Sequence, residues 1–266
     1  MPLEHVVDSE LLKRWKTRDP LDVLVVGCGG TGSAFACGLP YLHQAMQAKG
    51  LVGLNVKLMD GDLISETNCV RQPFSRGEIG LLKSVVLASR LNMFWGLHWE
   101  GVGGYLTEKS KPDADLVVGC VDSRSGRRLI HELVARKSSC VDYWLDIGNS
   151  ATSGQIVLGQ PWNARNKQSA ERLRTVAELY PEILDSSEED EETPSCSAID
   201  ALTKQQPFVN QTLAMQALAM LSRLFWDGRV GYHGLFTNLV TGRTTPLPID
   251  PRQWQRLKRW ERKGAS

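Results

Sequence analysis

The chain alternates short apolar runs with longer segments in which apolar residues recur every three or four positions. Runs of strand length occupy 22–27, 54–60, 114–122, 142–150 and 153–160. Helical periodicity occupies 31–48, 80–94, 126–137 and 205–228, with Pro40 as a point for a kink in the first of these. Residues 232–249 predict a terminal β-hairpin. The pattern predicts an α/β fold: a doubly wound, Rossmann-like, mostly parallel sheet with a C-terminal antiparallel hairpin.

Ligand sites of such sheets lie at the carboxyl ends of the strands, and the first strand here ends in a glycine-rich turn. Its glycines follow a G-x-G-G-x-G spacing before a helix, at Gly27, Gly29, Gly30 and Gly32. Such a turn holds phosphates on the backbone N–H groups of a helix start. A redox dinucleotide and an ATP that is cleaved between its α and β phosphates both fit it, so the turn alone leaves both open. The spacing G-x-x-x-x-G-K-[ST] is absent, which excludes a P-loop ATPase.

Polar side chains crowd the region after the second predicted strand. They are Asp60, Asp62, Asn68, Arg71 and Gln72, and Lys83 follows on the next predicted helix. An acid at the end of this strand binds ribose hydroxyls in nicotinamide-binding folds, and Asp60 occupies that position. Dehydrogenases have no general need for an arginine in the same stretch. The cluster therefore favours a reaction at the phosphates over hydride transfer.

Adenylation of a carboxylate requires fixed cations and a ligand for a metal ion, and the sequence offers candidates for both. The carboxylate attacks the α-phosphorus and pyrophosphate leaves, so negative charge builds up on the phosphate oxygens. Arg71 and Lys83 would supply fixed cations. Asp122 ends an apolar strand and would supply a ligand for Mg²⁺, which prefers one or two carboxylates together with phosphates.

The order of these residues resembles the adenylation domain of the ThiF/MoeB and ubiquitin-activating superfamily. The segments GCGGTG, DGDLISETNCVRQ and GCVDS, with Lys83 between the last two, match its motifs G-x-G-G-x-G, D-x-D-x-V-x-x-S-N-L-x-R-Q, lysine and C-x-D over about residues 22–150. A weaker likeness continues to the end of the chain. Within the superfamily the chain most resembles the ThiF-like proteins of bacterial PRTRC-type operons, which are associated with ubiquitin-like and deubiquitinase-like genes.

The resemblance implies ATP and Mg²⁺ as cofactors. It implies nucleotide binding by Gly27, Gly29, Gly30, Gly32, Asp60, Asp62, Asn68 and Gln72, and catalytic roles for Arg71, Lys83, Asp122 and Cys196. Thr67 replaces the usual serine of the second motif, and Cys69-Val70 replaces Leu-x, both mild changes. The implied substrate is the C-terminal carboxylate of a ubiquitin-like or sulfur-carrier protein that ends in glycine.

The resemblance also implies a homodimer. Relatives lend an arginine across the dimer interface, and the candidates for that role here are Arg14 and Arg18. Many relatives carry paired C-x-x-C motifs for zinc; the six cysteines here form no C-x-x-C pair, so we expect neither a structural zinc nor a disulfide scaffold. With 266 residues, a net charge of +1, no signal peptide and no run of about 18 apolar residues, we expect one cytoplasmic domain that binds neither membrane nor nucleic acid.

The alternation of strand and helix patterns stops at 161–198, and this predicts a mobile crossover loop there. Six acidic residues lie between Asp185 and Glu192, and Cys196 follows just before a helical pattern. In relatives that pass the activated carboxyl to a thiol, a cysteine lies in such a loop, so Cys196 is the candidate for a thioester. The acidic run opposes this by raising a thiol pKa, and a buried packing role for Cys196 stays open. Residues 250–266 form a basic tail that we expect to pack on the domain or on a partner.

Two other functions stay open. A nicotinamide-dependent Rossmann oxidoreductase explains the glycines and Asp60 but gives Arg71, Lys83 and Asp122 no role. A catalytically silent scaffold that binds a ubiquitin-like protein is the second, although silent relatives usually lack the arginine or the aspartate. Taken singly, Asp122 with Ser123 is explained equally well by capping of the next helix, and Lys83 by solvation on a helix surface.

Overall fold

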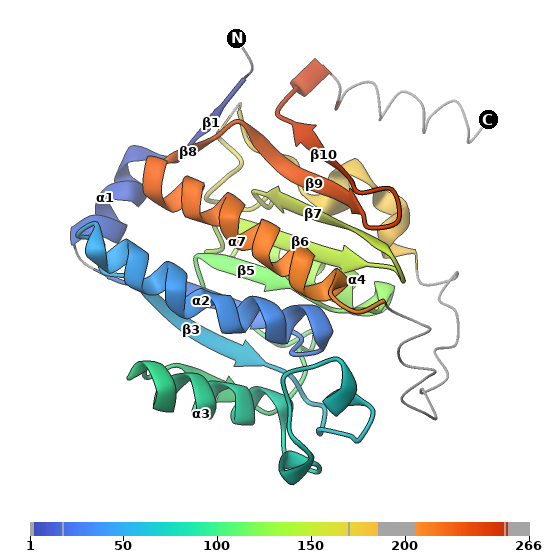
Figure 1. Ribbon diagram of the computed structural model, residues 1–266. Helices are drawn as coiled ribbons and strands as arrows, with labels where there is room; N and C mark the ends of the chain where they lie inside the picture. Colours follow the sequence, from blue (N-terminus) through green and yellow to red (C-terminus); the bar gives the residue numbers. More distant parts are fainter. Residues whose placement is uncertain (1–2, 18, 170, 186–205, 253, 255–266) are drawn as a thin grey trace.

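A computed structural model describes residues 3–17, 19–169, 171–185, 206–252 and 254 of the chain. Arg18, Cys196 and most of the basic tail lie outside these ranges. Figure 1 shows one layered α/β body in which a central sheet is covered by helices on both faces.

The sheet has eight strands in the order β10-β9-β7-β6-β5-β2-β3-β4. Five of them run parallel: β2 (Leu21–Val26), β3 (Leu54–Met59), β4 (Glu100–Val102), β5 (Leu116–Gly119) and β6 (Tyr143–Asn149). Three extend the sheet in antiparallel fashion: β7 (Ser153–Gly159), β9 (Tyr232–Asn238) and β10 (Arg243–Pro248). A separate two-stranded ribbon joins β1 (His5–Val6) to β8 (Arg229–Val230). The mostly parallel sheet and the terminal hairpin of β9 and β10 are confirmed.

The long helices α2 (Gly30–Ala48) and α7 (Val209–Asp227) lie side by side across one face of the sheet, and α4 (Arg124–Val134) lies behind it (Figure 1). The remaining helices are α1 (Ser9–Thr17), α3 (Lys83–Trp95), α5 (Val176–Leu179) and the 3₁₀ turns η1 (Asn68–Val70), η2 (Arg76–Glu78) and η3 (Pro181–Leu184). Val25, Val117 and Leu145, in the middle of the sheet, have no exposed surface. Helices on both faces bury these strands, which is why they read as continuous apolar runs.

Several elements differ from the expectation, and three of them do so for a clear local reason. Helix α1 is nine residues long, and its apolar contacts come from Leu11, Leu12 and Trp15, too few to give a clear periodicity. Strand β4 has only three residues and no apolar run. Helix α7 begins at Val209 rather than near residue 205, because Phe208 adopts a left-handed backbone with φ 71° that helix geometry excludes.

The two outer strands of the sheet are poorly suited to further pairing. Strand β10 contains Pro246 and Pro248, and β4 at the opposite edge is short. No helix in the described part of the chain is both long and apolar enough to cross a membrane.

Candidate active site

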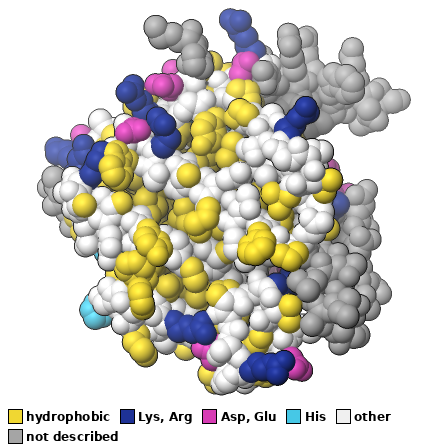
Figure 2. Space-filling view, viewed as in Figure 1, with side chains coloured by type: hydrophobic (Ala, Val, Ile, Leu, Met, Phe, Trp, Pro, Cys, Tyr) yellow, Lys and Arg dark blue, Asp and Glu magenta, His cyan; other side chains and the backbone are white. Residues whose placement is uncertain are grey.

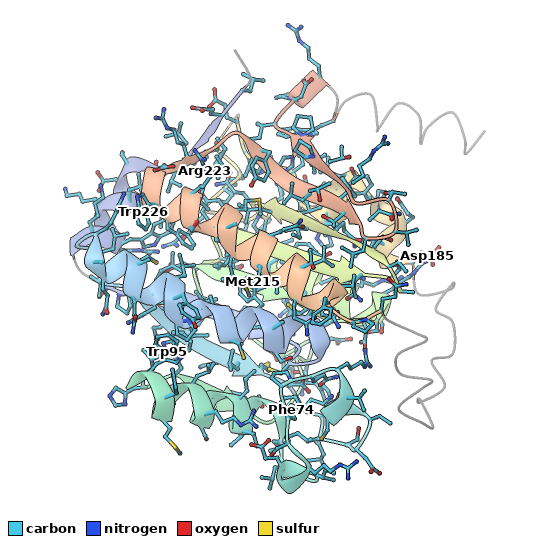
Figure 3. All side chains as sticks on the ribbon, viewed as in Figure 1. Phe74, Trp95, Asp185, Met215, Arg223 and Trp226 are labelled. Atoms are coloured by element: carbon cyan, nitrogen blue, oxygen red, sulfur yellow. The ribbon has the colours of Figure 1, made fainter. Side chains whose placement is uncertain are left out.

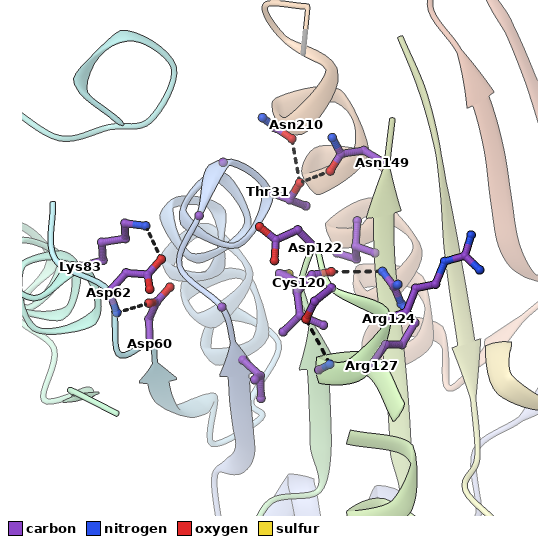
Figure 4. A pocket seen from close by; sticks show the side chains of 18 of the residues that line it. Thr31, Asp60, Asp62, Lys83, Cys120, Asp122, Arg124, Arg127, Asn149 and Asn210 are labelled. Atoms are coloured by element: carbon purple, nitrogen blue, oxygen red, sulfur yellow. Dashed lines mark hydrogen bonds and ion pairs between the residues drawn. The ribbon is translucent and has the colours of Figure 1, made fainter. Parts of the chain in front are cut away.

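The carboxyl ends of β2, β3 and β5 open into a cavity of about 1190 Å³. The glycine turn forms its floor, the chain after β3 forms one wall and the chain after β5 forms the other (Figure 4). Figure 4 shows Lys83 and Asp62 on one side of the glycine turn and Asp122 with Asn149 on the other. This is the edge of the sheet at which a doubly wound fold binds its ligand.

The glycines bring the start of α2 close to β2. Gly27 has φ +92°, and a side-chain carbon there would lie 2.7 Å from the carbonyl oxygen of Cys120. A side-chain carbon at Gly32 would lie 1.8 Å from the carbonyl oxygen of Gly27. Gly32 therefore lets the helix pack on the turn and does not itself line the cavity, whereas Gly27, Gly29 and Gly30 do. No side chain caps α2, so its first N–H groups are available to a phosphate in the cavity.

Asp60 ties the glycine turn to the end of β3. Its Oδ2 accepts a hydrogen bond from the backbone N–H of Cys28 at 2.5 Å, and its Oδ1 accepts one from the N–H of Asp62 at 2.8 Å. The side chain is buried, and burial raises the pKa of Asp60 despite these two hydrogen bonds. Asp60 is thus a fixed hydrogen-bond acceptor that joins the glycine turn to the end of β3.

Lys83, in the first turn of α3, is also buried, and its Nζ donates to Asp62 Oδ2 at 2.8 Å. Tyr105, in the loop after β4, donates its hydroxyl to the other oxygen, Asp62 Oδ1, at 2.5 Å. Burial would raise the pKa of Asp62, but the hydrogen bonds from Lys83 and Tyr105 outweigh it and lower the pKa. The hydrogen bond to Asp62 raises the pKa of Tyr105 to about 12. Asp62 is therefore a charged anchor that holds Lys83 at the cavity wall.

The turn η1 presents Asn68, Arg71 and Gln72 to the same cavity. The carbonyl oxygen of Asn68 accepts from the N–H groups of Arg71 and Gln72 at 3.2 and 2.9 Å. The Asn68 side chain accepts from the N–H of Ser65 at 2.9 Å. These bonds hold three polar side chains, one of them cationic, opposite the glycine turn.

Asp122 is exposed and faces the cavity three residues after β5 ends. It is not the cap of α4: Ser123 has that role, since its Oγ accepts from the N–H of Gly126 at 3.1 Å. The chain beneath Asp122 is held by a buried ion pair between Arg127 Nε and Asp146 Oδ1 at 2.7 Å. Arg127 also donates to the carbonyl oxygen of Val121 at 3.1 Å, next to Asp122. Asp146 was available as a signal in the sequence, because it is an acid within an apolar strand.

Three polar side chains that the sequence pattern did not single out connect three elements at the cavity. Thr31 of α2 donates to Asn210 Oδ1 of α7 at 2.8 Å, and Thr31 Oγ1 lies 3.0 Å from Asn149 Oδ1 of β6 (Figure 4). Asn210 is buried, and it interrupts an otherwise apolar face of α7. That interruption is the one signal in the sequence that pointed to it.

Most of the predicted site residues thus line this one cavity. They are Gly27, Gly29, Gly30, Asp60, Asp62, Asn68, Arg71, Gln72, Lys83 and Asp122. Their roles stay predictions. Cys196 lies outside the described residues. Cys28 and Cys120 are packing residues, and burial raises the pKa of both thiols.

Arg14 lies at the other end of the parallel strands from this cavity. It pairs with Asp115, just before β5, and lies 3.5 Å from Asp142, just before β6. Among the residues placed by the structure, no three His, Cys, Asp or Glu side chains gather to hold a metal ion. On the wall that follows β5 the cavity has one exposed carboxylate, Asp122, and a single carboxylate fits a magnesium ion that takes its other ligands from phosphates and water.

Solved structures with this fold include PaaA and E. coli MccB. The chain superposes on PaaA with a TM-score of 0.60 at 14% identity, covering 90% of this chain and 66% of that one. It superposes on MccB with a TM-score of 0.56 at 17% identity, covering 90% and 64%. MccB crystallised with ATP gives a TM-score of 0.54 at 15% identity, covering 90% and 66%. The chain thus spans just under two thirds of the length of these structures.

No curated protein sequence gives a significant match to the chain. The sequence profile of the ThiF family, by contrast, matches residues 5–240, which include the whole cavity. The chain belongs to the ThiF family.

Proposed function

We propose that the protein is an ATP-dependent adenylyltransferase that activates a carboxylate. The observation that carries this is the position of two cations and a carboxylate around one glycine turn: Arg71, Lys83 and Asp122 all face the cavity that the turn opens into. A hydride-transfer site has no use for such an arrangement, whereas transfer of an adenylyl group requires it.

In the proposed reaction the N–H groups at the start of α2 bind the phosphates of ATP, and Asp60 accepts hydrogen bonds from the ribose hydroxyls. A substrate carboxylate oxygen attacks the α-phosphorus, the bond from that phosphorus to the α–β bridging oxygen breaks, and pyrophosphate leaves. Arg71 and Lys83 neutralise the charge that grows on the phosphate oxygens. Asp62 supports this step by fixing Lys83, whose Nζ lies 2.8 Å from it.

Asp122 is the residue that we assign to Mg²⁺. When bound, the metal neutralises phosphate charge and orients the leaving group. The buried pair of Arg127 and Asp146 positions Asp122 for this task, because Arg127 fixes the backbone of the preceding residue.

We propose a protein or peptide C-terminus as the substrate, in the form of a ubiquitin-like or sulfur-carrier protein that ends in glycine. MccB, which shares the fold, has been crystallised with MccA, and this supports a separate partner molecule as the substrate. The narrower resemblance to PRTRC-type proteins stays a prediction, as does a thioester on Cys196.

We also propose that the protein is a homodimer. Apolar side chains gather over α2 and α7 on the face shown in Figure 2, and Met215 and Trp226 of α7 project from it in Figure 3. Met215 and Trp226 are close to half exposed, and Tyr41 of α2 is 66% exposed. Contiguous apolar surface of this kind marks protein interfaces. Light scattering tests this proposal. We expect the wild type to be a dimer and Met215→Glu to be a monomer, and a monomeric wild type would contradict the proposal.

The adenylation proposal is tested by exchange of labelled pyrophosphate into ATP with Mg²⁺ and a glycine-ended partner. We expect exchange that depends on the partner and on the metal. Tight binding of NADH that ATP does not compete with would instead favour the oxidoreductase. Binding of the partner without exchange and without ATP affinity would favour the silent scaffold.

A further inference from the structure

Tyr105 is an aromatic side chain at the cavity that the proposed reaction leaves without a role. It lies in the loop that follows β4, and the residue is 67% exposed although its hydroxyl is held by Asp62. The loop itself is fixed, because the N–H of Gly104 donates to the carbonyl oxygen of Asp60 at 3.2 Å. The ring is therefore anchored at both ends while most of its surface stays open.

The ring rests with its face on Gly61. A side-chain carbon at Gly61 would lie 2.5, 2.6 and 2.7 Å from Cε2, Cζ and Cδ2 of Tyr105. Three ring atoms at nearly equal distances indicate face-on contact, since an edge-on ring would bring one atom much closer than the others. Any residue larger than glycine at 61 would push the ring away. One face of Tyr105 is thus covered by backbone, and the other face is presented outward.

The order of the strands places Tyr105 next to the position that a nucleobase would take, and Tyr105 lines the cavity there. Phosphates at the glycine turn lie at the end of β2, and a ribose at Asp60 lies at the end of β3. The next strand outward is β4, about 4.8 Å further on, and Tyr105 follows it. The other two aromatic residues at the cavity, Tyr180 and Phe236, pair with each other at 5.8 Å on the opposite, antiparallel side of the sheet.

We propose that Tyr105 is the stacking platform for the base of the nucleotide, and that Gly61 is there to admit its ring; this deepens the proposed function and rests on it. Stacking of a base on an aromatic side chain contributes about 1–3 kcal/mol per base. A larger purine covers more of the ring than a pyrimidine does, so the platform favours ATP over CTP. Tyr105 is in this sense a specificity-determining residue, and Asp62 joins it to Lys83 in one hydrogen-bonded group.

The test measures equilibrium binding of non-hydrolysable ATP and CTP analogues, and of tripolyphosphate, by calorimetry. We expect Tyr105→Ala to weaken binding of the ATP analogue about 10-fold, to bring the ratio of ATP to CTP affinity toward one, and to leave tripolyphosphate binding unchanged. Tyr105→Phe keeps the ring and should lose much less. Gly61→Ala should reproduce Tyr105→Ala, because the added methyl displaces the ring.

Phe94→Ala is the matched control, since Phe94 is 80% exposed and lies at the far end of α3, about 16 Å along the helix from Lys83. Tyr105→Ala with wild-type affinity for the ATP analogue, or with an unchanged preference for ATP over CTP, would overturn the platform alone. A wild-type protein that binds tripolyphosphate but no ATP analogue would overturn the platform and the proposed function together. If Tyr105→Ala retains pyrophosphate exchange and also keeps the wild-type preference for ATP over CTP, the proposed function stands and the platform is rejected.

Discussion

The side-chain amide of Asn210 lies against Gly30: a side-chain carbon at Gly30 would be 2.3 Å from Nδ2 of Asn210. The two residues are 180 positions apart in the sequence, and their contact closes α7 against the start of α2. The same amide group accepts from Thr31 at 2.8 Å. The geometry of the glycine turn thus depends on a helix from the far end of the chain.

We expect Gly30→Ala to destabilise the protein by about 1–3 kcal/mol, although alanine normally favours a helix, because the methyl displaces the Asn210 amide. In a denaturant titration, Gly30→Ala combined with Asn210→Ala should cost less than the sum of the two single changes. Gly29→Ala is the control, since nothing lies within 4 Å of its added carbon. Strictly additive single changes would show that the contact does not govern stability.

Asp122→Asn should abolish partner-dependent pyrophosphate exchange and leave the melting temperature close to that of wild type, because Asp122 is exposed and Ser123 caps the helix. Removal of Mg²⁺ by a chelator should have the same effect on the wild type. Asp113→Asn changes an exposed aspartate before β5, at the opposite end of the strand, and should exchange normally. Wild-type exchange in Asp122→Asn would remove this residue from the mechanism.

Lys83→Met should lower the rate of adenylation roughly 10²–10³-fold with a much smaller change in nucleotide affinity, since its charge acts mainly on the transition state. Single-turnover kinetics and calorimetry separate the two quantities. Lys57→Met is the control, because Lys57 is exposed and pairs with Glu100 on the strands themselves. Equal small losses of rate and affinity would mean that Lys83 is only a structural partner of Asp62.

Acid should destabilise the protein through its buried histidines. Burial lowers the pKa of His233 to about 4, and its Nδ1 lies 2.9 Å from the carbonyl oxygen of Leu158. Between the unfolded value of 6.5 and about 4 the unfolded chain binds more protons, so the free energy of unfolding falls as the pH falls through this window. A shift of this size corresponds to a loss on the order of 3 kcal/mol for this residue.

His233→Gln keeps a donor for Leu158 but does not titrate, so the difference between its unfolding free energy and that of wild type should change with pH in this window. His98→Gln, at an exposed position, serves as the matched control. A constant difference for His233→Gln would mean that the imidazole becomes protonated without leaving its site.

Cys196→Ala decides whether the activated carboxyl passes to a thiol. Incubation of wild type with Mg-ATP and its partner should give a species on a non-reducing gel that thiol reductant removes. The variant should lose this species and retain pyrophosphate exchange. A reductant-sensitive adduct that persists in Cys196→Ala would assign the thioester to another cysteine. If the wild type adenylates its partner but forms no such adduct, the reaction stops at the adenylate.

Most of the residues that sequence alone identified lie in two short stretches of the chain, the glycine turn at 27–32 and the polar cluster at 60–72. The acid and amide cluster from Asp60 to Gln72 follows a single strand, so its members share one wall of the cavity for local reasons. Asn149 and Asn210 were missed because they reach Thr31 of α2 only through the packing of α2 on β6 and on α7. Tyr105 was missed for a related reason: its role depends on contact with Gly61, and an isolated tyrosine in a loop carries no pattern.

The boundaries of elements were harder to predict than their existence. The apolar run at 114–122 predicts a strand that reaches Asp122, yet β5 ends at Gly119. The chain then leaves the sheet, and Arg127 binds the carbonyl oxygen of Val121. The segment after β5 is thus held by Arg127 of α4, which also pairs with Asp146 of β6, and local propensity encodes neither contact.

The prolines of β10 have a consequence for how the protein meets other chains. A proline has no N–H to donate to an incoming strand, and Pro246 and Pro248 lie on the outermost strand of the sheet, while the opposite edge has only three residues. Both edges of the sheet therefore disfavour pairing with an added strand, and with it the edge-to-edge polymerisation that leads to aggregates. A flexible tail from another protein would therefore gain few backbone hydrogen bonds by lying alongside either edge of the sheet.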